Sequence, residues 1–202
     1  MGPMGPVRKG NSDVRKSPTR RDVLIAAGAA PFVTAAAALA RQDHREHPSL
    51  SSAEKEKQAF PFLTLKMFIE TSSEDTKGVV SIVRIFVPAG DGPPPHIHSR
   101  EDEIHTVVRG HYRYRHGDTE VDAPAGTVIF MPRNIPHVFR NVGTEPGEHL
   151  LTLIPGGMEK MFREASDARV QMPRDVAKLT EIYARYGLTN LSPESLPLAT
   201  GR

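Results

Sequence analysis

Hydrophobic and polar residues alternate through the middle of this chain, between residues 62 and 154. Alternation with a period of two is typical of strands that bury one face, whereas a helix repeats with a period of about 3.6 residues. Turn-forming residues interrupt the alternation, notably at 88–95 and 116–118. The pattern predicts an all-β domain of short antiparallel strands. The expected strands are 62–71, 79–87, 103–109, 111–115, 119–122, 127–131, 137–141 and 149–154.

After residue 155 the hydrophobic period becomes that of a helix. A second helix is expected to begin with Pro173 in its first turn and to end at Gly187. The tail, residues 190–202, contains two prolines and little periodicity, which predicts a loose extension. The apolar stripes of both helices are expected to pack against the core or a second copy of the chain. They comprise Met158, Met161, Phe162 and Ala165, then Val176, Leu179, Ile182, Tyr183 and Tyr186.

The first forty residues have the pattern of a targeting segment. The paired arginines of Thr19-Arg-Arg-Asp-Val-Leu precede an Ala-rich stretch that ends in the small-x-small site Ala38-Leu-Ala40. This resembles a bacterial twin-arginine export signal, and the resemblance implies a periplasmic or extracellular protein that begins near Arg41. An ordinary secretory signal and an uncleaved anchor are the alternatives. The stretch is short and Ala-dominated and contains Gly28 and Pro31, so no stable membrane insertion is expected after cleavage.

Removing this segment changes the charge of the chain. The whole sequence has 26 basic and 24 acidic residues, and residues 1–40 contain six of the basic and two of the acidic residues. The remaining 20 basic and 22 acidic residues give a net charge of −2, so no nucleic-acid partner is expected. The absence of cysteine excludes disulfides and thiolate ligands. We expect a linker at 41–60, one β domain at 61–155, and helices with a tail at 156–202.

Two glycine-bounded segments, residues 90–110 and 126–141, contain histidines at fixed spacings. Their order and spacing match both halves of the cupin signature, and the chain therefore resembles the cupin superfamily. Asn134 stands where the family usually has glycine, and asparagine tolerates the positive φ that this position is expected to need. The matching positions include His96, His98, Glu103, Pro132, His137 and Asn141.

Three imidazoles and one carboxylate suit a borderline divalent metal and leave positions open on an octahedral ion. We expect His96, His98, Glu103 and His137 to be its ligands. A histidine-rich loop beside an unrelated hairpin is the alternative, but it does not explain the glycines and Pro132. Export in the folded state, implied by the twin-arginine resemblance, would let the cytoplasm choose the metal. This favours Mn or Fe over the tighter-binding ions, with Ni, Co, Zn and Cu also open.

The resemblance implies a double-stranded β-helix, or jelly-roll, barrel with C-terminal helices. The overall pattern is similar to small single-barrel cupins related to quercetin 2,3-dioxygenases, in which the ligand carboxylate, here Glu103, also acts as a base. His105 should share the inward face of its strand, where it either transfers protons with Glu103 or is a buried core histidine. We expect His111 and His116 to face solvent, and Tyr112 and Tyr114 to pack on one sheet face.

Three functions follow from such a site, each with a small-molecule partner. The first is a dioxygenase acting on a flavonol-like, phenolic or enolic substrate. The second is an isomerase or decarboxylase that uses the metal as a Lewis acid, and the third is a non-catalytic binding protein. An apolar, aromatic pocket would favour the first. Inward-facing arginines would favour the second, and Arg109 and Arg113 are the candidates. Each of the three functions is compatible with a homodimer.

Overall fold

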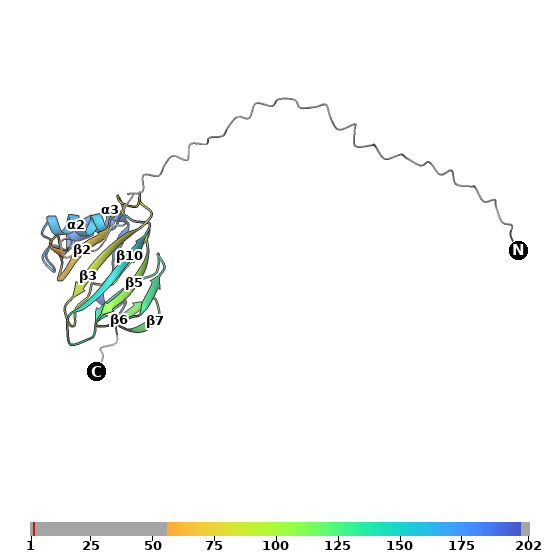
Figure 1. Ribbon diagram of the computed structural model, residues 1–202, viewed down its shortest axis with the longest axis horizontal. Helices are drawn as coiled ribbons and strands as arrows, with labels where there is room; N and C mark the ends of the chain where they lie inside the picture. Colours follow the sequence, from red (N-terminus) through yellow and green to blue (C-terminus); the bar gives the residue numbers. More distant parts are fainter. Residues whose placement is uncertain (1, 3–55, 199–202) are drawn as a thin grey trace, which may run out of the picture. The chain divides into compact units, whose positions relative to one another are not determined.

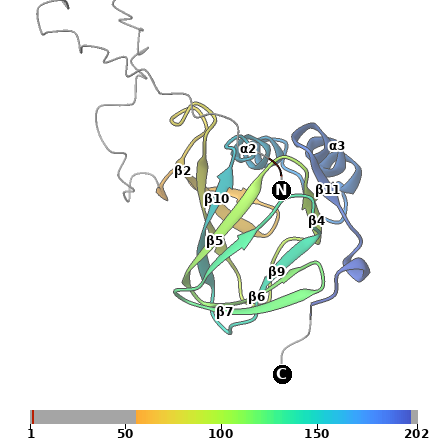
Figure 2. The same cartoon turned by 90° about the vertical axis from the view of Figure 1, so that its right-hand side faces the viewer.

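Two antiparallel sheets face each other and enclose the core of the protein (Figures 1 and 2). The larger sheet has the strand order β1-β2-β3-β10-β5-β8, and the smaller has β11-β4-β9-β6-β7. This is the expected all-β barrel with C-terminal helices. The strands are β1 (Phe60–Phe62), β2 (Leu65–Thr71), β3 (Ser81–Val87), β4 (His96–His98), β5 (Asp102–Arg109), β6 (His111–His116), β7 (Thr119–Pro124), β8 (Val128–Met131), β9 (His137–Asn141), β10 (Gly147–Ile154) and β11 (Leu188–Asn190).

The computed structural model describes Gly2 and residues 56–198. Apart from Gly2, the predicted export signal, residues 1–40, therefore lies outside the described residues, as do most of the predicted linker and the last four residues of the tail. None of the helices within 56–198 is long and apolar enough to cross a membrane.

The core forms because alternate residues of each strand point inward. In β3, Val83, Ile85 and Val87 are buried while the residues between them are partly exposed. Each fully buried aliphatic side chain of this kind contributes about 1.5–3 kcal/mol relative to exposure. Tyr112 and Tyr114 both point into the barrel from β6, as expected from the alternation.

The predicted strand 62–71 is in fact a hairpin. β1 and β2 pair with Phe62 opposite Leu65, and Leu63 in the turn between them has a φ of 53°. The sequence pattern did not reveal the turn because Phe62 and Leu65 are both buried, so hydrophobic residues continue through it. The left-handed conformation at Leu63 is unusual for a residue with a side chain, and nothing in its residue type signals it.

Two helices, α2 (Glu159–Asp167) and α3 (Val176–Tyr186), follow β10 and pack beside the barrel (Figure 2). Phe162 of α2 contacts Phe62 edge-on, with the ring centroids 4.9 Å apart. The predicted start of the second helix at Pro173 is wrong. Asp175 accepts a hydrogen bond from the backbone N–H of Gln171 and donates its own N–H to the Gln171 carbonyl, so a closed turn precedes the helix.

Most of the apolar residues predicted to form a stripe on each helix are buried within the chain itself. The exceptions lie at the two ends of α3, where Val176 is exposed and Tyr186 is partly exposed. α3 ends at Gly187, as predicted, and this glycine has the left-handed conformation with a φ of 79°.

The expectation that the tail beginning at Asn190 is a loose extension is wrong for its described part. Leu188–Asn190 forms β11, which pairs antiparallel with β4. Beyond it, a short 3₁₀ helix at Pro193–Ser195 leads to Leu196, which is buried, and the carbonyl of Pro197 accepts a hydrogen bond from Arg115. Backbone pairing, which depends little on residue type, therefore holds this segment against the smaller sheet.

Candidate metal centre

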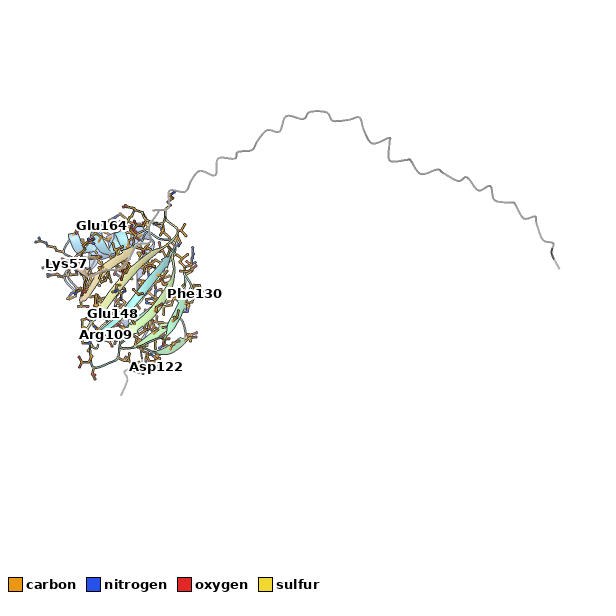
Figure 3. The ribbon with its side chains drawn as sticks, in the orientation of Figure 1. Lys57, Arg109, Asp122, Phe130, Glu148 and Glu164 are labelled. Carbon is orange, nitrogen blue, oxygen red and sulfur yellow. The ribbon has the colours of Figure 1, made fainter. Side chains whose placement is uncertain are left out.

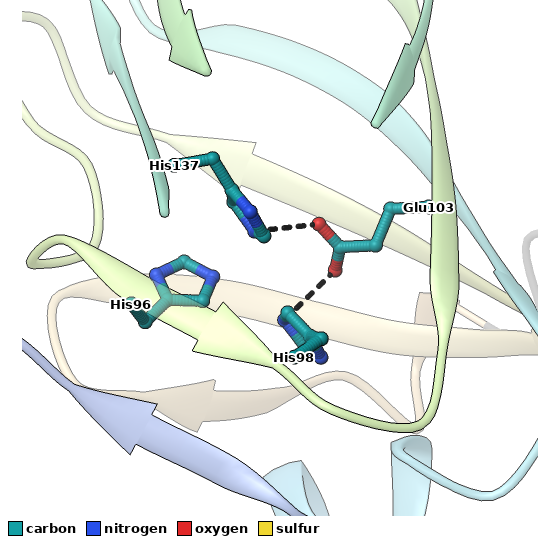
Figure 4. Close-up of side chains that lie close together, drawn as sticks. All are labelled: His96, His98, Glu103 and His137. Atoms are coloured by element: carbon teal, nitrogen blue, oxygen red, sulfur yellow. Dashed lines mark ion pairs between the residues drawn. The ribbon is translucent and has the colours of Figure 1, made fainter. Parts of the chain in front are cut away.

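Four side chains from three strands meet inside the barrel (Figure 4). His96 and His98 come from β4 and His137 begins β9, so these three belong to the smaller sheet, whereas Glu103 reaches them from β5 of the larger sheet. Their ligand atoms all lie within 4.8 Å of one another. Glu103 is central, because its Oε1 is 3.2 Å from His98 Nε2 and its Oε2 is 3.1 Å from His137 Nε2. The structure thus brings together all four residues predicted from the sequence.

Backbone contacts outside the cluster fix two of the imidazoles. His96 Nδ1 lies 2.8 Å from the Pro94 carbonyl oxygen, and His137 Nδ1 lies 3.0 Å from that of Ile135. A carbonyl can only accept a hydrogen bond, so each Nδ1 carries the proton and each Nε2 offers its lone pair to the centre. This pattern of outer hydrogen bonds is typical of metal-binding histidines.

The turn before β9 joins the two ligand segments. Asn134 has a φ of 65°, as expected for the position where the family pattern has glycine. Its backbone N–H donates to the carbonyl of His98 at 2.7 Å, which places the approach to His137 directly against β4. Asparagine therefore supplies the left-handed turn here without the flexibility of glycine.

The electrostatics of the cluster are dominated by burial and by Glu103. Burial by itself would raise the pKa of Glu103, but the imidazoles of His98, His105 and His137 outweigh it and hold this pKa well below its usual range. Burial, together with the neighbouring imidazoles of His137 and His98, lowers the pKa of His96 well below its usual value. Burial opposes protonation of His137, yet its contact with Glu103 raises its pKa. The centre thus contains an ionised carboxylate.

These residues fit a divalent cation. His98, Glu103 and His137 are each only 2% exposed, so the carboxylate is removed from water and needs a positive partner. The facing Nε2 atoms are the type of ligand that borderline first-row metals prefer, alongside one carboxylate oxygen. A metal ion here would be held by His96, His98, Glu103 and His137.

His105 is buried on the inward face of β5, and its Nε2 lies 3.3 Å from Glu103 Oε2. The structure therefore places it where it can hydrogen-bond the carboxylate. Sequence reasoning missed His149, which is fully buried on β10 with its ring 5.1 Å from that of His105. The signal was present, because alternation along β10 puts His149 on the same inward face as Leu151 and Leu153.

The remaining sequence candidates are not members of the cluster. His111 is exposed as expected, and it pairs with Asp122 at 2.8 Å. His116 is instead half-buried, with its ring 6.1 Å from that of His137. Neither candidate for an inward arginine faces the interior. Arg113 lies between the inward-pointing Tyr112 and Tyr114, and Arg109 is the last residue of β5. Arg109 is exposed and lies opposite Glu148 (Figure 3), and Arg113 forms ion pairs with Glu120 and Asp122.

A cavity of about 40 Å³ is lined by three of the four side chains, His96, His98 and Glu103, and by His105. Apart from the histidines and Glu103, apolar and aromatic residues line it, and no lysine or arginine is among these lining residues of the described chain. Met161 and Phe162 of α2 and Tyr183 of α3 contribute to one side, so the helices help to close the cavity. The remaining apolar and aromatic lining residues are Phe62, Leu65, Met67, Ile85, Pro93, Phe139, Leu151 and Leu188.

Residues 83–160, which include the four clustered side chains, match a protein-family model described as "Cupin domain". No curated protein matches the sequence.

Solved structures of similar architecture include a predicted oxalate decarboxylase from Thermotoga maritima, which is 25% identical with a TM-score of 0.44, over 45% of this chain and 80% of that protein. KdgF from Halomonas sp. is 16% identical with a TM-score of 0.43, over 57% of this chain and 92% of that one. The nucleoside dehydratase Pac13 is 15% identical with a TM-score of 0.45, over 69% of this chain and 91% of that one.

Proposed function

We propose that this chain is a metal-dependent dioxygenase for small phenolic or enolic substrates, because it has a cupin domain and four clustered candidate ligands beside an apolar cavity. The observation that carries the proposal is the composition of the cavity lining. Aromatic and aliphatic side chains favour an uncharged, planar, apolar ligand over a sugar or a multiply charged acid. An isomerase or decarboxylase acting on carboxylates would be better served by an inward cation, and Arg109 and Arg113 lie elsewhere.

The size of the cavity argues for a small substrate. An engineered apolar cavity that binds benzene has a volume of about 150 Å³, whereas the cavity beside the candidate metal centre measures about 40 Å³. Even a single-ring phenol therefore requires side chains at the cavity to move. Met161 is suited to this, because methionine is unbranched and adapts its shape at little cost. A three-ring flavonol would require a larger displacement of α2 and α3.

A divalent metal held by His96, His98, Glu103 and His137 would supply a Lewis-acidic centre for a chelating oxygen substrate and, if redox-active, one-electron chemistry with O₂. The chain's own contribution is to orient the substrate, exclude water and accept a proton. The apolar lining excludes bulk water from the cavity and strengthens the electrostatic contacts within it.

Glu103 is the proposed acceptor of the proton from the substrate hydroxyl. Since its pKa is held well below the usual range, Glu103 alone is a weak base, and a second acceptor nearby would favour removal of the proton. In the tautomer that carries its proton on Nδ1, His105 presents the lone pair of Nε2 at 3.3 Å from Glu103 Oε2 and can receive the proton there. The proposed roles are therefore proton acceptor for Glu103 and proton carrier for His105.

The proposal is tested by loading the purified chain, without residues 1–40, with Mn²⁺ or Fe²⁺ under anaerobic conditions. Oxygen uptake is then measured with a panel of catechols, enediols and flavonols, and products are identified by mass spectrometry. We expect oxygen consumption with small phenolic or enolic compounds and incorporation of both atoms of ¹⁸O₂. Tight binding of such a ligand without oxygen uptake would indicate a binding protein. Turnover of sugars or keto acids without O₂ would indicate Lewis-acid chemistry.

We further propose that the protein is exported through the twin-arginine route and acts in the periplasm or outside the cell. The support is the arginine pair of Arg20 and Arg21, followed by an apolar stretch and a small-residue cleavage site. Export after folding would allow the metal to be acquired in the cytoplasm, which favours Mn or Fe at this site.

A further inference from the structure

Glu101 is a buried carboxylate next to the candidate metal centre. Its side chain lies in the turn between β4 and β5, and the residue is 5% exposed. Its Oε2 is 3.5 Å from Nδ1 of His98, and neither atom has a hydrogen-bond partner elsewhere in residues 56–198. A buried carboxylate oxygen and a buried imidazole nitrogen each destabilise the fold when they are left unpaired, so these two atoms are expected to pair with one another.

We propose that Glu101 is a positioning residue that accepts a hydrogen bond from Nδ1–H of His98 and thereby directs His98 Nε2 to a metal ion. This inference rests on the proposed metal binding by the four clustered residues. Glu101 would be an acidic hydrogen-bond partner of His98 alone among the three histidines. His96 and His137 direct their Nδ1 atoms to backbone carbonyls, so His98 differs from both in having a carboxylate as its nearest partner.

The turn is built so that Glu101 faces inward. On one side, Ser99 donates from its backbone N–H and its hydroxyl to the Gly187 carbonyl, at 2.9 and 2.8 Å. On the other side, Asp102 points outward and binds Arg133 through both carboxylate oxygens. With its neighbours held in this way, Glu101 has its side chain beside His98 in the interior.

The charge balance of the centre supports a role in metal binding. Glu101 and Glu103 are both buried, and together two carboxylates would balance the charge of a divalent cation. A carboxylate partner also makes the imidazole a stronger electron donor than a carbonyl partner does. His98 is therefore expected to be the most strongly donating of the three histidines.

The test compares Glu101→Gln with a matched control, Glu159→Gln. Glu159 is also buried, but it binds the backbone N–H groups of Ser73 and Gly157 and is no part of the cluster. Co²⁺ affinity is measured by competition with a chelator, and the visible spectrum of the Co²⁺-loaded protein reports on the ligand field. We expect Glu101→Gln to weaken Co²⁺ binding about 10–100-fold and to shift the spectrum. Glu159→Gln should change neither.

Wild-type affinity and an unshifted spectrum in Glu101→Gln would overturn the role of Glu101 while leaving the metal site intact. Failure of the wild-type chain to bind Co²⁺ would overturn the metal site and the inference together. If Glu101→Gln does not fold, the wild type still decides the question. In the Zn²⁺-loaded protein, nitrogen NMR should show His98 with a protonated, exchange-protected Nδ1, and a rapidly exchanging Nδ1–H would refute the inference.

Discussion

Arg133 binds Asp102 through three hydrogen bonds, and this pair joins the two segments that carry the candidate ligands. The backbone N–H and Nε of Arg133 both donate to Asp102 Oδ1 at 2.9 Å, and Nη2 donates to Oδ2 at 2.8 Å. Asp102 directly precedes Glu103, and Arg133 lies four residues before His137. The ion pair on the outside of the barrel thus fixes the relative positions of two ligand residues inside it.

Arg133→Gln should therefore loosen the centre without removing a ligand. We expect a modest loss of Co²⁺ affinity, and an altered dependence of stability on pH. The hydrogen bonds from Arg133 lower the pKa of Asp102 to about 2. A carboxyl group whose pKa is lower in the folded chain than in the unfolded chain stabilises the fold at pH values above its unfolded-state pKa. This stabilisation is lost as the pH falls through its folded-state pKa. Urea unfolding between about pH 5 and pH 2 should show this decrease in the wild type and less of it in Arg133→Gln.

Removal of a clustered histidine should abolish metal binding but preserve the barrel. His98→Ala and His137→Ala each delete one proposed ligand. Loss of a hydrogen-bond partner of a metal ligand typically weakens metal binding by up to about 100-fold. We expect the loss of a ligand itself to weaken binding by more than this. Elemental analysis and circular dichroism measure the two effects. The control is His111→Ala, which removes an exposed histidine on the β6–β7 hairpin. Full metal occupancy in both cluster variants would refute the assignment.

Glu103→Gln should separate substrate binding from turnover. The amide fills the same space but cannot accept the proton from the substrate hydroxyl, and loss of a general base typically costs about 10²–10⁴-fold in rate. We expect a large fall in kcat with a smaller change in KM, measured after the variant is shown to be metal-loaded. His105→Gln should lower kcat less, because it removes only the second acceptor. Equal turnover by wild type and Glu103→Gln would exclude the proposed proton transfer.

His149 should be tolerant of replacement by phenylalanine. Both of its ring nitrogens are buried without a hydrogen-bond partner in the described residues, and an apolar ring of similar shape removes that penalty. We expect His149→Phe to match or exceed the wild-type free energy of unfolding at pH 7. A loss larger than about 1 kcal/mol would instead show that His149 has a partner such as ordered water.

The same variant should be less sensitive to acid. Burial, together with the nearby His105, lowers the pKa of His149 well below 6.5. Below pH 6.5 the unfolded chain therefore binds a proton that the folded chain excludes, and stability falls as the pH decreases. His149→Phe should lack this part of the decrease. Unfolding of both proteins with a chelator present, at pH 8 and pH 5, measures the difference.

Export should depend on the identity of the arginine pair, not on its charge. Changing Arg20 and Arg21 together to lysine preserves the positive charge but removes the residues that a twin-arginine receptor reads. We expect the double variant to stay in the cytoplasm uncleaved, as followed by cell fractionation and mass spectrometry. The matched control changes Arg8 and Arg15 to lysine in the lead-in. Normal export of the double variant would indicate an ordinary secretory signal.

The sequence predicted the four clustered residues because each has a chemically distinctive side chain at a fixed spacing. His149 was missed although its strand alternates, because a lone histidine among leucines has no partner at a recognisable interval. Glu101 could not be singled out, since Glu101, Asp102 and Glu103 are consecutive acidic residues and only the fold decides which of them point inward. Arg113 points outward because Tyr112 and Tyr114, on either side of it, point inward. Alternation alone does not show which face of the strand is inward, so this could be predicted only if the tyrosines were known to be buried.

β11 has a consequence for the solubility of the chain. β4, which carries His96 and His98, would be the outermost strand of the smaller sheet without β11. An open strand edge exposes unpaired backbone groups that can recruit the strands of other molecules. By pairing with His96–His98, residues Leu188–Asn190 occupy that edge. Truncation after Gly187 would therefore leave the strand that carries His96 and His98 open to intermolecular pairing, and the truncated chain should aggregate.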